Sequence, residues 1–177
     1  MPKIIENARG LIIDEAKRQI EEHGYENVTI RSIAKGCSLG LGTFYNYFKS
    51  KDILIATFLL EDWQERIGRI CEQSREERDT IKVIGSIHND LCEFNENHKG
   101  IFTSPEAIKS FNNTVSSYHK LLRIQIAEPI FNSLIASGGY ENCEFLSQFI
   151  AESILTWSVG KKSFDELEPI FIKLLKK

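Results

Sequence analysis

Hydrophobic residues recur along this chain at spacings of three and four positions, as they do on the buried face of an amphipathic helix. The first such segment covers about residues 6 to 23 and ends before Gly24, where glycine commonly stops a helix. Its stripe consists of Leu11, Ile12, Ala16 and Ile20. Neither alternating strand patterns nor internal repeats compete with this periodicity, so the chain is predicted to be all-α.

Two short helices and one long helix are predicted to follow. Thr29 is expected to cap the first short helix, which runs to about Gly36. A tight turn at about residues 38–40 leads to the second short helix, which ends at about Tyr47. Ser50 and Asp52 then open the long fourth helix. Its buried side is predicted to carry Ile53, Leu54, Phe58 and Ile67.

The rest of the chain is also predicted to be helical, with Pro129 kinking the longest segment. Segments are expected at about residues 78–98, 105–111, 113–137, 142–159 and 164–175, between glycine and proline breaks. The expected fold, with about nine helices in all, is a three-helix head joined by a long helix to a C-terminal helical bundle. We place the head at residues 1–52 and the bundle at residues 53–177.

Composition places the chain among ordinary soluble proteins. It has 177 residues, 42% of them hydrophobic, and contains no run of 18 apolar residues. Charged residues near the N-terminus break up the apolar segment that a signal peptide would need, so a cytoplasmic location is expected. Four separated cysteines, with no CxxC pair, are typical of reduced structural thiols: Cys37, Cys71, Cys92 and Cys143.

Charge is unevenly distributed along the chain. Residues 1–51 hold eight Lys and Arg against six Asp and Glu, whereas residues 52–177 hold fourteen against nineteen. A mildly basic head on an acidic body fits a small polyanion-binding module attached to a part with another role.

The sequence Gly40-Leu41-Gly42 raises the alternative of a phosphate-binding loop. Such a loop follows a buried strand and needs a third glycine or a GK[ST] sequence. Here the preceding residues have helical spacing and neither of these features is present, so a nucleotide fingerprint is disfavoured.

Two short helices around a tight turn are instead typical of a helix-turn-helix. The apolar positions that would pack its helices together are Ile30, Ile33, Ala34, Leu39, Phe44 and Phe48. The positions left outside, where DNA could be contacted, are Arg31, Leu41, Gly42, Thr43, Tyr45, Asn46 and Tyr47.

This stretch resembles the N-terminal signature of the tetracycline-repressor (TetR) family of bacterial transcriptional regulators. The resemblance covers about residues 8–55 and rests on Gly24-Tyr25, Thr29, Ile33-Ala34, the run GTFYNYF at 42–48, and Ser50-Lys51. It implies that Arg31, Leu41, Gly42, Thr43 and Asn46 face the major groove, and Thr29 is also expected among the residues that contact DNA. Tyr45, Tyr47 and Lys51 would reach phosphates, with simple packing as the alternative for the two tyrosines. The departures from the family pattern are Ser38, Gly40 and Leu41.

The resemblance also implies a small-molecule cavity among the middle helices. Candidate lining residues are Phe58, His88, Cys92, Phe94 and Tyr118, although aromatic residues on helices commonly form a core instead. An apolar or aromatic effector is expected, because charged groups are sparse there. His88 and Cys92 share a helix face but are too few for a metal site, and no nucleophile motif is present, so neither a metal, a cofactor nor an enzymatic activity is expected.

The last two helices are predicted to form a dimer interface. Each has an apolar stripe, and the resemblance implies that such helices pair with their symmetry mates as a four-helix bundle. The stripes contain Phe145, Phe149, Ile150, Ile154, Trp157, Leu167, Ile170, Phe171 and Leu174. Closure of the protomer's own core is the alternative.

Two classes of function remain open on the sequence. The first is a homodimeric repressor that binds a palindromic DNA operator and is released by a small-molecule effector. The second is a helical small-molecule-binding protein or enzyme whose head has lost DNA binding, which the exposed Leu41 and the modest basic charge of the head would allow.

Overall fold

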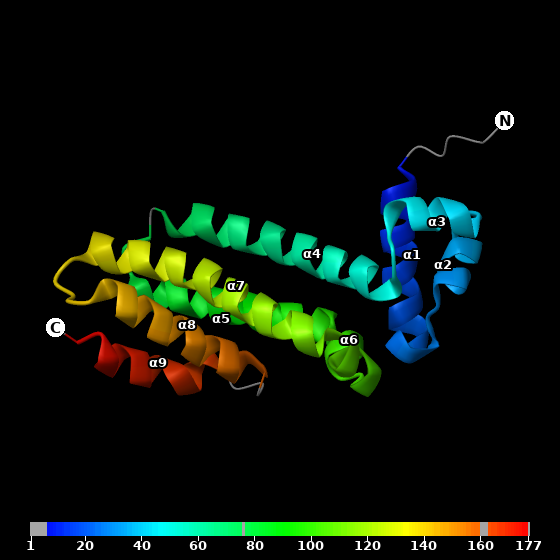
Figure 1. Cartoon of the computed structure of the whole chain (residues 1–177). Helices are drawn as coiled ribbons and strands as arrows, with labels where there is room; N and C mark the ends of the chain where they lie inside the picture. Colours follow the sequence, from blue (N-terminus) through cyan, green and yellow to red (C-terminus); the bar gives the residue numbers. More distant parts are fainter. Residues whose placement is uncertain (1–6, 76, 160–162, 177) are drawn as a thin grey trace. The chain divides into compact units, whose positions relative to one another are not determined.

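Helices joined by short connections form the part of the chain that the computed structural model describes, which is residues 7–75, 77–159 and 163–176, with only the backbone described for 111–119. Within these ranges there are nine α-helices and one short 3₁₀ helix, and no strand (Figure 1). The predicted all-α fold is therefore confirmed. Among the described residues, no helix combines the length and apolar character needed to cross a membrane.

The N-terminal helices agree closely with the predicted ones. They are α1 (Ala8–His23), the 3₁₀ helix η1 (Tyr25–Asn27), α2 (Ile30–Gly36), α3 (Leu41–Tyr47) and α4 (Lys51–Ser74). Gly24 follows α1 with a φ of 78°, a left-handed conformation that glycine adopts without steric cost. Ser50 accepts a hydrogen bond from the Ile53 amide and so caps α4 as expected.

The C-terminal helices differ from the predicted ones in two places. They are α5 (Thr80–Asn97), α6 (Lys99–Phe102), α7 (Pro105–Ser137), α8 (Cys143–Val159) and α9 (Phe164–Leu174). The predicted break near residue 112 is wrong, because α7 continues through it and through Pro129. The four-residue helix α6 was not predicted, since so short a segment has no measurable periodicity.

The chain forms two compact units. Unit 1 extends to Asp62 and includes His98–Asn113, and unit 2 contains Trp63–Asn97 and the chain from Thr114 onward. Helix α4 contributes its first half to unit 1 and its second half to unit 2. The division at residue 52 was drawn by expected function, and it stays a prediction.

Unit 1 has an apolar core formed mainly by α1 to α4, to which η1, α6 and the start of α7 also contribute. Ile12, Ala16, Phe44, Leu54 and Phe58 are among its fully buried members. Ile33, Ala34 and Phe48 are also buried there, and Ile30 and Leu39 pack against it, so the predicted packing of α1, α2 and α3 is confirmed. The predictions for Leu11 and Ile53 are wrong: these residues are 44% and 50% exposed, because they lie beside rather than on the buried faces of α1 and α4.

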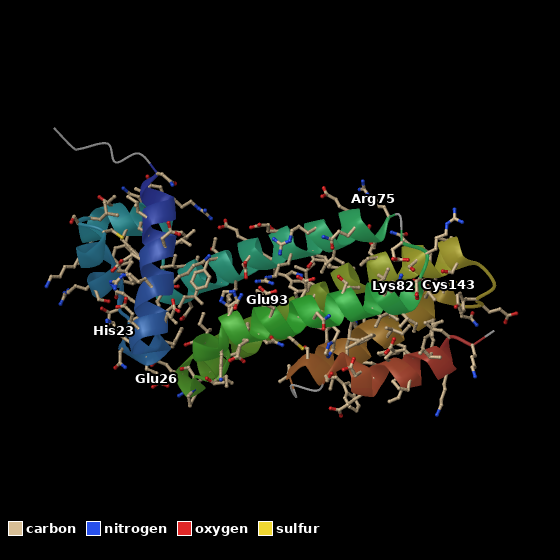
Figure 2. All side chains as sticks on the ribbon, turned by 180° about the vertical axis from the view of Figure 1, so that it is seen from behind. His23, Glu26, Arg75, Lys82, Glu93 and Cys143 are labelled. Atoms are coloured by element: carbon tan, nitrogen blue, oxygen red, sulfur yellow. The ribbon has the colours of Figure 1, made fainter. Side chains whose placement is uncertain are left out.

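Polar contacts attach the segment His98–Asn113 to the rest of unit 1. His98 Nε2 lies 2.8 Å from Asp62 Oδ2, at the start of α6. Ser104 Oγ donates to Glu26 Oε1 over 3.1 Å, and Glu26 lies in η1 (Figure 2). Residues 36 and 78 positions apart in the sequence thus hold α6 and the start of α7 against α4 and η1.

In unit 2, α5 packs against both α8 and α9. Trp63 and Phe94 meet edge to face with ring centroids 5.5 Å apart, and Trp63 Nε1 donates to Gln125 Oε1 over 3.0 Å. Arg66 is buried near two carboxylates of α5, those of Asp90 and Glu93. Burial raises the pKa of Asp90, which Arg66 partly offsets.

The four cysteines are free thiols. Burial raises the pKa of Cys37, Cys71 and Cys92, which keeps these groups protonated and poorly reactive. This agrees with the expectation of structural thiols.

Candidate nucleic-acid interface

The start of α2 is fixed by a reciprocal cap. Thr29 Oγ1 accepts from the Ser32 amide, and Ser32 Oγ accepts from the Thr29 amide, both over 3.0 Å. Ser32 Oγ also donates to Gln19 Oε1 over 2.6 Å, which fastens α2 to α1. Thr29, predicted to contact DNA, therefore uses its hydroxyl within the head.

The turn between α2 and α3 contains a residue in the left-handed conformation. Ser38 has a φ of 55°, where glycine would be free of steric cost. The Leu39 amide then donates to Ala34 O over 2.8 Å, and Gly40 precedes the first residue of α3. The predicted tight turn is confirmed.

Helix α3 separates its residues into an inner and an outer side. Phe44 is buried within it, and Phe48 is buried just after its end. The outer side exposes Leu41, Gly42, Tyr45, Asn46 and Tyr47, while Thr43 is half-buried. Because both tyrosine rings are nearly half exposed, the alternative that they merely pack in the core is disfavoured.

The segment around these helices is basic and contains no acidic residue. From Asn27 to Lys51 the chain has four cationic side chains and neither Asp nor Glu. Arg31, Lys35 and Lys49 are exposed on this segment. On α1, the carboxylate of Glu15 is paired with Arg18, and hydrogen bonds from Arg18 and Gln19 lower its pKa to about 2.

Lys51 lies in a different place from the one expected. Its side chain is only 16% exposed, and its ammonium lies 3.9 Å from the centre of the Tyr25 ring. The same nitrogen donates to Tyr25 O over 3.1 Å and lies 3.5 Å from Glu106. These internal contacts do not support the expected phosphate contact by Lys51.

The predicted effector residues do not form one described pocket. Phe58 belongs to the core of unit 1, where its ring lies 6.0 Å from that of His98. His88, Cys92 and Phe94 lie on α5 in unit 2. The side chain of Tyr118 lies outside the described residues, so the predicted pocket stays a prediction.

His88 is buried beside Phe164, with ring centroids 5.7 Å apart, and Cys92 Sγ lies 3.8 Å from its Nε2. Burial lowers the pKa of His88. Among the described residues, no group of three potential metal ligands includes this pair.

The residues expected at the dimer interface divide into two groups. Ile150, Ile154, Leu167 and Phe171 are buried inside the protomer, so for these four the alternative of core closure holds. The exposed group contains Phe145, Phe149, Ile170 and Leu174, with Trp157 half-buried. The helix faces that pack on α5 could not be distinguished from the outer faces by periodicity alone.

Helix α7 adds exposed apolar residues that were missed. Ile124, Phe131 and Ile135 recur at spacings of seven and four, a signal available in the sequence. Together with Phe145 and Phe149 they form what we call the α7–α8 apolar face. Arg123 and Glu152, 3.6 Å apart, join the two helices.

An open hollow lies at one end of this face, between the C-terminal part of α7 and the start of α8. Its volume is about 610 Å³, and its lining includes Phe131, Ile135, Tyr140, Cys143 and Phe145. Figure 2 shows Cys143 at this end of unit 2, and Figure 1 shows α8 between α7 and α9.

Comparisons with known proteins agree with this geometry. Residues 12–57 match the family model described as bacterial regulatory proteins, tetR family. The regulator UidR of Escherichia coli K12 is 31% identical over 64 residues, which cover 36% of this chain and 33% of UidR. The chain thus matches about a third of the length of that relative.

One relative matches along most of its length. The fatty acid metabolism regulator protein of Bacillus subtilis is 27% identical over 171 residues, covering 87% of this chain and 85% of that protein. The structure of Thermus thermophilus FadR in complex with lauroyl-CoA, described as a TetR-family repressor, has a TM-score of 0.62 at 18% identity. It covers 94% of this chain and 92% of FadR, which shows the shared fold. These relatives are named as regulators and none as an enzyme.

Proposed function

Because this chain belongs to the TetR family of bacterial transcriptional regulators, we propose that it is a homodimeric repressor whose paired α3 helices bind a palindromic DNA operator. The observation that carries the proposal is the outer side of α3, which exposes Leu41, Tyr45, Asn46 and Tyr47 within a segment free of acidic residues. We assign DNA binding to residues 1–52, and effector and dimer contacts to residues 53–177.

The exposed residues differ in the part of DNA that they suit. Arg31, Thr43 and Asn46 carry donors and acceptors able to read base edges in the major groove. The phosphates beside the major groove could accept hydrogen bonds from the hydroxyl groups of Tyr45 and Tyr47. The same phosphates would attract the positive charges of Lys35 and Lys49. Lys49 takes the role first expected of Lys51, because its side chain is exposed.

The α7–α8 apolar face supports a homodimer. Phe145 is 71% exposed, and its ring stacks on that of Phe149 at 6.5 Å between centroids. Apolar side chains exposed together on neighbouring helices are typical of a surface that a partner covers. A two-fold axis through it would pair the same residues of two copies and give two α3 helices for two half-sites.

A fatty acyl-CoA is the effector class that the relatives support. A regulator of fatty acid metabolism matches most of this chain, and lauroyl-CoA is bound by a protein with the same fold. An acyl chain also fits the expectation of an apolar effector. Such a ligand would release the operator only if it bound the conformation that cannot bind DNA more tightly than the conformation that can.

The experiment selects DNA from a random-sequence pool with the full chain. A palindromic consensus is expected, and failure to enrich any sequence would contradict the proposed function. Lauroyl-CoA is then titrated into the complex, with coenzyme A and laurate as separate controls. Release by lauroyl-CoA alone is expected, and the operator should weaken lauroyl-CoA binding by the same factor, commonly about 5- to 150-fold. Indifference to lauroyl-CoA would overturn the effector assignment and leave DNA binding intact.

A further inference from the structure

Leu41 stands alone between two glycines at the exposed start of α3. Its side chain is 39% exposed, whereas Leu39, on the other side of Gly40, packs against the core of unit 1. With no side chain at Gly40 or Gly42, no immediate chain neighbour flanks the isobutyl group of Leu41.

Nothing within the protomer requires glycine at these two positions. A Cβ added at Gly40 or at Gly42 would meet no atom within 4 Å. Neither glycine has a positive φ, so any residue could adopt the same backbone. Gly42 also weakens its own helix, because glycine is among the poorest helix formers. Gly40 is the N-cap of α3, a position that glycine suits, so only Gly42 lacks a benefit within the fold.

The surroundings identify DNA as the external surface. Leu41 shares the outer side of α3 with Tyr45 and Asn46, within the acid-free segment that exposes Arg31 and Lys49. An exposed leucine offers no hydrogen bond to a phosphate or a base edge. In the major groove its complement is the C5-methyl group of thymine.

We propose that Leu41 reads a thymine methyl group in each half-site, and that Gly42 removes the side chain that would hold α3 away from the bases. This rests on the proposed function, and it adds a specific base to it. The contact is apolar, so the thymine would be recognised by its methyl group rather than by a hydrogen bond.

The test replaces thymines of the selected operator, one position at a time, with deoxyuridine, which lacks only the methyl group. At one position per half-site the wild-type chain should lose about fourfold in affinity, the usual effect of one buried methyl group. Leu41→Ala should bind both DNAs equally, because the group that senses the methyl is gone. Leu41→Met should restore part of the difference. Leu11→Ala, which removes a leucine of similar exposure from α1, is the control and should retain it.

Wild-type affinity that is unchanged by deoxyuridine at every position would overturn the inference while leaving operator binding established. The inference would also be overturned if deoxyuridine lowered the affinity of Leu41→Ala as much as it lowers that of the wild type. If the wild type selects no DNA at all, it is the proposed function that fails.

Gly42→Ala tests the close approach separately. Gly68 in α4 is the matched control, since it is also exposed, helical and without neighbours within 4 Å of an added Cβ. Gly42→Ala and Gly68→Ala should both melt at a higher temperature than the wild type, because alanine favours the helix more than glycine does. Gly42→Ala alone should bind the operator at least about tenfold more weakly, the scale of one lost base contact. Equal operator affinity of the two variants would contradict the close approach.

Discussion

The ammonium of Lys51 lies 3.9 Å above the ring of Tyr25, whose hydroxyl donates to Asp52 over 2.7 Å. Burial and the neighbouring Asp52 carboxylate raise the pKa of Tyr25, so the phenol stays protonated and keeps this bond. Glu106, from the first turn of α7, completes the group at 3.5 Å from the Lys51 nitrogen. A lysine near α3, the proposed DNA-binding helix, therefore acts inside unit 1.

Lys51→Met should destabilise the protein rather than weaken its phosphate contacts. The variant keeps an apolar stem but loses a cation–π contact and a hydrogen bond, so unfolding in urea should show a loss of about 1–2 kcal/mol. Lys49→Met is the matched control and should change stability by less than about 0.5 kcal/mol. Lys49→Met should instead reduce the slope of log affinity against log salt concentration by about one, the value for one fewer counterion released on DNA binding. A lower salt slope for Lys51→Met, with unchanged stability, would contradict its placement.

Phe149→Glu should disrupt the proposed dimer. A charge placed on the α7–α8 apolar face would be desolvated in the paired state and hydrated in the free protomer. Sedimentation of the variant should then report the 20.3 kDa protomer. The measurement is made at about 1 μM, where a stable dimer with a nanomolar dissociation constant would remain paired. Ile53→Glu, at an equally exposed apolar position in unit 1, should remain dimeric. A dimeric Phe149→Glu protein would place the interface elsewhere.

His88 should make the fold sensitive to mild acid. Because burial lowers its pKa, the unfolded chain takes up a proton at a higher pH than the folded protein does. The stability associated with neutral His88 is therefore complete above the unfolded value of about 6.5 and is lost as the pH falls below it. The urea midpoint should drop between pH 7.5 and pH 5.5 by more in the wild type than in His88→Leu. Identical drops would show that His88 does not titrate on unfolding.

Ser38→Gly should stabilise the head. The left-handed conformation costs a non-glycine residue about 1–2 kcal/mol, and the extra flexibility of unfolded glycine offsets about 0.5–1 kcal/mol of the relief. A net gain of about 0.5–1 kcal/mol is expected by urea unfolding. Ser86→Gly, inside α5, should lose about 0.5 kcal/mol instead. A loss in both variants would mean that Ser38 makes a compensating contact.

Local signals in the sequence were sufficient to predict the head. Gly24, the Thr29 cap and the apolar spacing of α2 and α3 depend on residues a few positions apart, and the structure has them as predicted. The continuity of α7 through residue 112 was missed because two asparagines in succession favour a turn locally. Packing of a long helix can override such a preference.

Side-chain placement depended on partners distant in the sequence. Lys51 is drawn inward by Glu106, 55 positions further on, which no local pattern could reveal. The apolar stripes of α8 and α9 were likewise recognised, but which residues face α5 and which face outward is decided by tertiary packing. For the same reason, the sequence could not show that Phe58 belongs to unit 1 while His88, Cys92 and Phe94 belong to unit 2.

The most direct test of the central claim, that α3 and its neighbours read a DNA sequence, is a comparison of two affinities at one salt concentration. Fluorescence anisotropy would measure binding of the full chain to the selected operator and to a scrambled duplex of the same composition, in about 0.15 M salt. We expect the operator to bind at least about a thousandfold more tightly, and Arg31→Ala to lower this ratio by about 5- to 150-fold, the effect of one base contact. Equal affinity of the wild type for the two duplexes would contradict the account.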